Sequence, residues 1–155
     1  MQKVLDTLSA ELKGLERELR IELPKEIKAA LALGDLKENA EYHAALERQA
    51  YVKARIGQLR GRLSELGAVN MALIPRDKVS LGSRVELLDL DSDQEIRYEL
   101  VVPELAESRD GLISVASPIG KGLMGKKVGD EVSIRIPSGT KNYEVLELST
   151  IHDRA

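Results

Sequence analysis

Apolar residues recur at spacings of three and four along two stretches in the first half of the chain. The first stretch contains Leu5, Leu8, Leu12, Leu15 and Leu19, and the second contains Ala45, Gln49, Val52, Ile56, Leu59, Leu63 and Leu66. A 3.5-residue period marks the seam of a coiled coil. The pattern therefore predicts helices over residues 4–23 and about 36–66, joined by a short turn into an antiparallel hairpin.

Pro24 interrupts the first of these stretches. A proline costs about 3 kcal/mol inside a helix but is tolerated in its first turn. Either the helix is kinked there or a new helical segment begins with Pro24 at its first position. The apolar pattern resumes at Ile27, Ala30 and Leu31. We therefore expect a kink and not a separate domain.

After Lys78 the apolar spacing changes to two, which is typical of strands. The pattern predicts strands over 83–90, 95–102, 112–116, 132–136 and 143–148. Ser117-Pro118 is typical of an N-cap followed by the first residue of a short helix, here ending near Gly125. The expected fold is α+β: a coiled-coil hairpin over 1–75 and a small antiparallel β domain with a short helix over 79–155. A linker over 69–78, containing Pro75, lies between them.

The turn of the hairpin, Gly34-Asp35-Leu36-Lys37-Glu38, supports two interpretations. In the first, Gly34 ends one helix, Asp35 caps the next, and Glu38 completes a capping box. In the second, Asp35 and Glu38 bring two carboxylates together at an exposed tip. Mg²⁺ is commonly bound by one or two carboxylates with phosphate oxygens and water, so such a tip could complete a metal site that belongs to a partner. The two interpretations are compatible.

The composition excludes several classes of protein. The chain contains no Cys, Phe or Trp, which argues against thiolate metal sites, disulfides and a large aromatic ligand pocket. It has no 18-residue apolar run and no signal-peptide core. We therefore expect a cytoplasmic protein that binds neither a membrane nor a small-molecule substrate. Residues 1–75 carry 12 basic and 11 acidic side chains, whereas residues 76–155 carry 11 and 15. Neither half has the basic charge of a free-standing nucleic-acid binder.

Two motifs resemble those of the bacterial Gre family of transcript cleavage factors, and of its GreA branch more than GreB. The first is Gly34-Asp35-Leu36-Lys37-Glu38-Asn39-Ala40-Glu41-Tyr42-His43-Ala44-Ala45. The second is Ser117-Pro118-Ile119-Gly120-Lys121-Gly122-Leu123, followed by Gly125-Lys126-Lys127-Val128-Gly129-Asp130. The resemblance covers nearly the whole chain, and it implies a C-terminal domain similar to FKBP-type prolyl isomerases.

The resemblance also implies a function. Such factors bind RNA polymerase and insert their coiled coil into its secondary channel, where the RNA 3′ end lies after backtracking. Asp35 and Glu38 would then help to hold a second Mg²⁺ shared with the polymerase, whose own active site cuts the RNA. The chain would be a catalytic accessory and not an enzyme. Ser117, Pro118 and Ile119 would belong to the docking surface, and Asn39, Glu41 and Tyr42 would support the tip.

The chain departs from the family pattern near the tip. Family members commonly carry a basic residue three positions before the tip glycine and another just after the His-Ala-Ala stretch, where this chain has Leu31 and Leu46. The basic patch for the extruded RNA is thus partly missing, and Lys28, Arg48, Lys53 and Arg55 are candidates to replace it. Leucines also cluster near the tip, and they either pack the distal hairpin or form an apolar surface that contacts a partner: Leu31, Leu33, Leu36 and Leu46. The alternative function is a non-cleaving regulator that occupies the channel.

Overall fold

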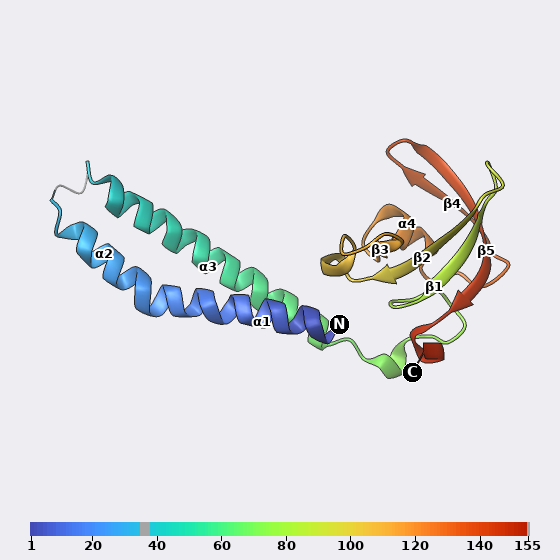
Figure 1. The fold of residues 1–155 in the computed structure, drawn as a ribbon, viewed down its shortest axis with the longest axis horizontal. Coiled ribbons are helices and arrows are strands. Elements are labelled where there is room, and N and C mark those ends of the chain that lie inside the picture. The colour runs from blue at the N-terminus through green and yellow to red at the C-terminus, as the bar shows by residue number, and fades with distance from the viewer. Residues whose placement is uncertain (35–37, 155) are drawn as a thin grey trace. The chain divides into compact units, whose positions relative to one another are not determined.

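The computed structural model describes residues 1–34 and 38–154. These residues form two compact units, Met1–Val69 and Asn70–Ala155. The first unit is helical, and the second is built on a five-stranded sheet with one short α-helix (Figure 1). The predicted α+β fold, a helical hairpin followed by a small β domain, is confirmed.

The first unit is an antiparallel helical hairpin. Its outgoing arm consists of α1 (Gln2–Arg17), a π-helical turn (Glu18–Glu22) and α2 (Leu23–Leu31), and its returning arm is α3 (Ala40–Gly67). Both α1 and α2 pack against α3, as the ribbon shows (Figure 1). The heptad pattern accounts for this pairing, because Val52, Ile56 and Leu59 are almost fully buried against the outgoing arm.

The irregularity that Pro24 predicts is a π-helical turn placed just before it. Pro24 lies in the first turn of α2. In a continuous α-helix its ring would collide with the carbonyl group of Arg20, four residues earlier. In the π turn, the backbone N–H of Leu23 instead donates to the carbonyl oxygen of Glu18, five residues earlier. Such single π turns are a recognised way to accommodate a local irregularity within a helix.

Two bidentate ion pairs link the arms on one side of the hairpin. Arg48 donates to both carboxylate oxygens of Glu18 at 2.6 and 2.8 Å, and Arg55 donates to both oxygens of Glu11 at 2.9 and 3.0 Å. The two arginines are one heptad apart, as are the two glutamates, so the pairs repeat with the coiled-coil period. Paired planar groups fix geometry as well as adding energy, so these contacts set the register of the two arms.

The second unit contains strands β1 (Arg84–Asp89), β2 (Glu95–Val101), β3 (Leu112–Ser114), β4 (Glu131–Ile136) and β5 (Gly139–Ser149). The sheet order is β3-β2-β1-β5-β4. The neighbouring strands are antiparallel except for β2 and β3, which are parallel. The predicted antiparallel β domain therefore describes every strand pairing except that of β2 with β3. The chain between β2 and β3 returns through a short 3₁₀ turn, Pro103–Leu105, and β3 then runs in the direction of β2.

One face of the sheet packs against the short helix α4 (Pro118–Leu123). Leu123 of α4 is fully buried with residues of the strands, among them Leu87, Leu100 and Val145. Two glycines let α4 lie close to its neighbours. A Cβ atom on Gly120 would lie 2.1 Å from the carbonyl oxygen of Ser114, and one on Gly122 would lie 2.6 Å from Cγ1 of Ile134.

The division between the units falls between Val69 and Asn70, inside the segment that the sequence marks as a linker. Residues that follow are tied to the second unit: a ring nitrogen of His152 lies 2.7 Å from the carbonyl oxygen of Ile74, and Val79 is buried in the sheet core. The predicted linker therefore shortens to a few residues. Among the residues that the structure describes, no helix is long and apolar enough to cross a membrane.

Limited proteolysis is expected to cut first between residues 69 and 73. Val69, Met71 and Leu73 are exposed there, with Leu73 at 79%, and cleavage between compact units requires few contacts to be broken. The measurement is the mass of the first fragments released by a protease that cleaves beside apolar residues, such as thermolysin or chymotrypsin. First cleavage within residues 79–150, or within the helices of the hairpin, would contradict the assigned boundary.

Candidate functional site

The tip of the hairpin lies between the end of α2 and the start of α3. Ala32 is the C-cap residue of α2, and Gly34 follows with φ of +126°, a conformation that side chains rarely adopt. Glu38 is exposed and directly precedes the N-cap of α3. Asp35 lies outside the described residues, so the structure does not test its position or its role. A carboxylate at Glu38 is therefore presented to solvent at the end of the hairpin.

The N-cap of α3 is Asn39, which corrects the prediction that Asp35 caps this helix with Glu38 at its third position. The backbone N–H of Tyr42 donates to the Asn39 Oδ1 atom at 3.0 Å. Helix α3 consequently begins at Ala40 and not near Leu36. Asn is as good an N-cap as Asp, so the sequence did contain this signal. The more complete capping-box pattern of Asp35 and Glu38 concealed it.

Asn39 also joins the two arms of the hairpin. Its side-chain amide nitrogen donates to the carbonyl oxygen of Ala30, near the end of α2. Among the described residues of the hairpin, Asn39 is the buried polar side chain, with 9% exposure. Both of its polar atoms are thus hydrogen-bonded, one to each arm, as burial requires.

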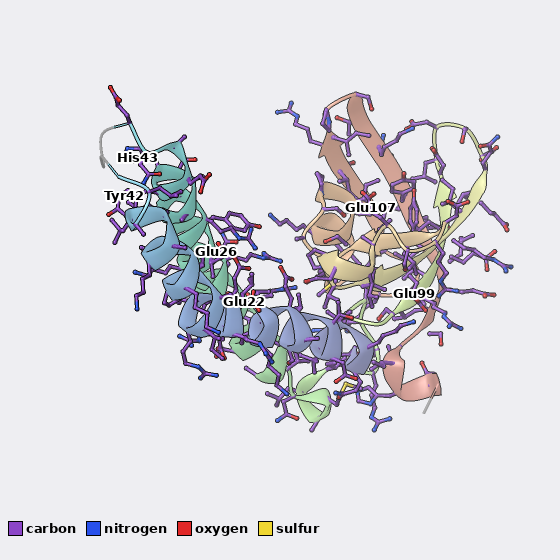
Figure 2. The ribbon with its side chains drawn as sticks, turned by 60° about the vertical axis from the view of Figure 1, so that its left-hand side comes forward. Glu22, Glu26, Tyr42, His43, Glu99 and Glu107 are labelled. Atoms are coloured by element: carbon purple, nitrogen blue, oxygen red, sulfur yellow. The ribbon has the colours of Figure 1, made fainter. Side chains whose placement is uncertain are left out.

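The other residues predicted to support the tip lie on the first turn of α3. Glu41 is exposed, and Tyr42 is half-buried with its ring 5.8 Å from that of His43, edge to face. Figure 2 shows Tyr42 and His43 at the distal end of the hairpin. Glu26 and Glu22 lie progressively further from the tip on the outgoing arm. The backbone N–H of His43 donates to the carbonyl oxygen of Asn39, which begins the helical ladder.

The described part of the tip does not form a metal site by itself. Glu38 and Glu41 line a shallow hollow together with Leu33, Asn39 and Ala40. Across residues 1–34 and 38–154, no group of three or more histidine, aspartate and glutamate side chains is placed to hold a metal ion. Carboxylate oxygens are donors that suit a hard cation such as Mg²⁺.

The basic residues behind the tip are not equally available. Arg48 and Arg55 are hydrogen-bonded to Glu18 and Glu11, and these bonds hold the pKa of both carboxyl groups below its usual range. They therefore serve first to join the arms. Lys28 and Lys53 are exposed and remain the candidates for contact with an anion. Leu31 is 45% exposed and Leu33 is 66% exposed, so the end of α2 presents apolar surface, whereas Leu46 is half-buried.

The second predicted site, Ser117-Pro118-Ile119, begins α4. Ser117 is its N-cap, as predicted: the backbone N–H of Gly120 donates to the Ser117 hydroxyl oxygen at 3.0 Å, and this hydroxyl donates to the carbonyl oxygen of Ser114 at 2.6 Å. Pro118 is exposed, and Ile119 is half-buried against the core. The loop is therefore a rigid feature that presents a proline to solvent.

The two halves of the chain match two sequence profiles. Residues 2–67 match the profile described as "Transcription elongation factor, N-terminal", and residues 74–150 match "Transcription elongation factor, GreA/GreB, C-term". Together these matches cover both structural units.

Proteins that share one name are similar to this chain over most of their length. Transcription elongation factor GreA of Helicobacter hepaticus is 49% identical over 143 residues, covering 92% of this chain and 88% of that protein. The GreA protein of Thermodesulfovibrio yellowstonii is 43% identical and covers 87% of each. The crystal structure of GreA factor homolog 1 of Thermus thermophilus is 31% identical and covers 93% of each chain with a TM-score of 0.42. The chain belongs to the GreA/GreB family of transcription elongation factors.

Proposed function

We propose that this chain binds RNA polymerase and stimulates the polymerase to cleave the RNA 3′ end in backtracked or arrested complexes. Its membership of the GreA/GreB family gives the target. The observation that carries the proposal is the exposed carboxylate of Glu38 at the distal end of a long two-helix arm. Such an arm suits delivery of a reactive group into a deep channel. Acting on the polymerase, the factor would work in the bacterial cytoplasm.

The hairpin is long, and its two arms are held in one register, as delivery of a side chain into a channel would require. Helix α3 has 28 residues, which at 1.5 Å per residue corresponds to about 42 Å. The bidentate pairs Arg48–Glu18 and Arg55–Glu11 hold the two arms in one register along this length. The catalytic benefit of a delivered group depends on its orientation, so an arm with one register is of more use than a flexible tether.

Asp35 and Glu38 would hold Mg²⁺ jointly with ligands of the polymerase. Mg²⁺ bound there would help to stabilise the attacking and leaving oxygens of phosphoryl transfer. Glu38 supplies a hard anionic oxygen, and Asp35 stands three residues before it in the sequence. These two carboxylates would also orient the attacking water. By resemblance to the family, the polymerase's own active site would cut the RNA, and this chain would be an accessory factor.

The second unit would dock the factor on the polymerase through Ser117, Pro118 and Ile119. A charged residue at an exposed position of such a surface disfavours binding, whereas it leaves a solvent-facing turn intact. We expect Pro118→Glu to weaken polymerase binding at least about tenfold with little change in melting temperature. Competition against labelled wild-type factor measures this. A matched variant, Pro137→Glu in the turn between β4 and β5, should bind normally. Equal affinity of the two variants would remove Ser117-Pro118-Ile119 from the interface.

The proposed function is tested by adding the chain to purified, stalled elongation complexes whose RNA is labelled at its 5′ end. Stimulation is expected to shorten the labelled RNA and leave it able to be extended. Free RNA without polymerase should remain intact, because the cut is assigned to the polymerase's own active site. Inhibition of elongation without shortening of the RNA would instead identify a non-cleaving channel regulator.

A further inference from the structure

We infer that Asn39 is a positioning residue that ties the end of α2 to the start of α3 and so holds Glu38 in the orientation needed for cleavage. This role rests on the function proposed above. Asn39 directly follows Glu38 in the chain, and its side chain contacts both arms.

The Asn39 side chain makes one hydrogen bond as an acceptor and one as a donor. Its Oδ1 atom accepts from the backbone N–H of Tyr42 at 3.0 Å and so starts α3. Its amide nitrogen donates to the carbonyl oxygen of Ala30 and so ties this start to the end of α2. One side chain therefore bridges the end of α2 and the start of α3. A bridge directly after Glu38 restricts where that residue can lie relative to the two arms.

Burial makes this bridge difficult to replace. Asn39 is 9% exposed and Ala30 is 3% exposed. The Ala30 carbonyl oxygen also accepts from the Leu33 backbone N–H at 3.1 Å, so loss of the amide would break the link between the arms without leaving this oxygen unsatisfied. Because both groups are buried, water would have little access to replace the lost amide. The small side chains Ala30 and Ala45, both buried, let α2 and α3 approach at this level. The geometry thus depends on a side chain that both donates and accepts, which an amide does and a carboxylate does not.

Substitutions at Asn39 can therefore separate its positioning role from its role as the N-cap. Ser and Asp cap helices about as well as Asn does. Asn39→Ser and Asn39→Asp therefore keep an acceptor for the Tyr42 N–H but lose the amide that reaches Ala30. Asn39→Ser adds no charge near the proposed metal ligands, so it is the cleaner variant. Asn70 gives a matched control: it caps the 3₁₀ turn Met71–Leu73 by accepting from the Ala72 N–H at 3.0 Å, and it is exposed.

The first measurement is the distance distribution between nitroxide labels across the tip. The chain has no cysteine, so cysteines introduced at the exposed residues Leu33 and Ala44 are labelled selectively. We expect Asn39→Ser and Asn39→Asp to broaden the distribution and Asn70→Ser to leave it unchanged. An unchanged distribution in both Asn39 variants would overturn the proposed clamp, whatever their activity.

The second measurement is the cleavage rate in stalled complexes as a function of factor concentration. We expect Asn39→Ser to lower the maximal rate about fivefold, the size of one lost hydrogen bond. The half-saturating concentration should not change, because the docking surface is untouched, and Asn70→Ser should match the wild type. A broadened tip with an undiminished maximal rate would overturn the positioning role. If the unsubstituted chain stimulated no cleavage, the proposed function and this role would both fall, whereas the label distances would still decide the clamp.

Discussion

Asp35→Asn and Glu38→Gln are each expected to reduce stimulated RNA cleavage about tenfold or more. Each substitution keeps the shape of the side chain and removes its negative charge. Mg²⁺ prefers anionic oxygen ligands, and a loss of about 1.4 kcal/mol of transition-state stabilisation lowers the rate tenfold. The measurement is the initial rate of RNA shortening in stalled complexes at saturating factor, with polymerase binding and melting temperature determined for each variant.

Glu47→Gln is the matched control for these variants. It removes the same charge from an exposed position on α3, beyond the turn. The structure removes one competing explanation for a loss at Glu38, because Asn39 caps α3 and Glu38 precedes the cap. Full activity of folded Asp35→Asn and Glu38→Gln proteins would exclude the tip carboxylates from the mechanism.

Leu23→Ala is expected to destabilise the hairpin by about 2–5 kcal/mol, the usual cost of removing a buried leucine side chain. Leu23 is the first residue of α2, directly after the π turn, and it is fully buried, where it packs with Val52 and Ile56. The hairpin core is narrow, so little surrounding structure is available to fill the cavity. Urea unfolding followed by helical circular dichroism measures the effect, because most helical residues lie in the first unit.

Leu33→Ala provides the comparison for Leu23. Leu33 is 66% exposed, so its loss should change stability by no more than about 0.5 kcal/mol. If the two variants unfolded at the same urea concentration, Leu23 would not be the core residue that the structure assigns.

The heptad pattern was sufficient to predict the hairpin, because burial of one apolar stripe dominates the stability of a helix in a protein. The start of α3 was not predictable in the same way. Asp35 and Glu38 have the spacing of a capping box, yet Asn39 caps the helix. Its second hydrogen bond is donated to the carbonyl oxygen of Ala30 on the opposite arm. A tertiary contact of this kind leaves no local signal in the sequence.

Alternating apolar residues likewise predicted the strands but not all of their directions. Residues 112–116 have the composition of a strand, and the structure places β3 at Leu112–Ser114. Its parallel pairing with β2 depends on the path of the intervening chain, which periodicity does not encode. The prediction of the functional site was limited in the same way. The sequence identified the residue types at the tip and in the Ser117 loop, whereas the commitment of Arg48 and Arg55 to Glu18 and Glu11 required the register of the two arms.

We propose that this chain supplies metal-binding carboxylates to the active site of its partner. The most direct test is the Mg²⁺ dependence of the maximal cleavage rate at saturating factor, compared between the wild type and the Asp35→Asn/Glu38→Gln double variant. The double variant is expected to need a higher Mg²⁺ concentration for half-maximal cleavage, and excess Mg²⁺ should partly restore its rate. A rate lowered by the same factor at every Mg²⁺ concentration, with an unchanged half-maximal concentration, would contradict a role in metal binding.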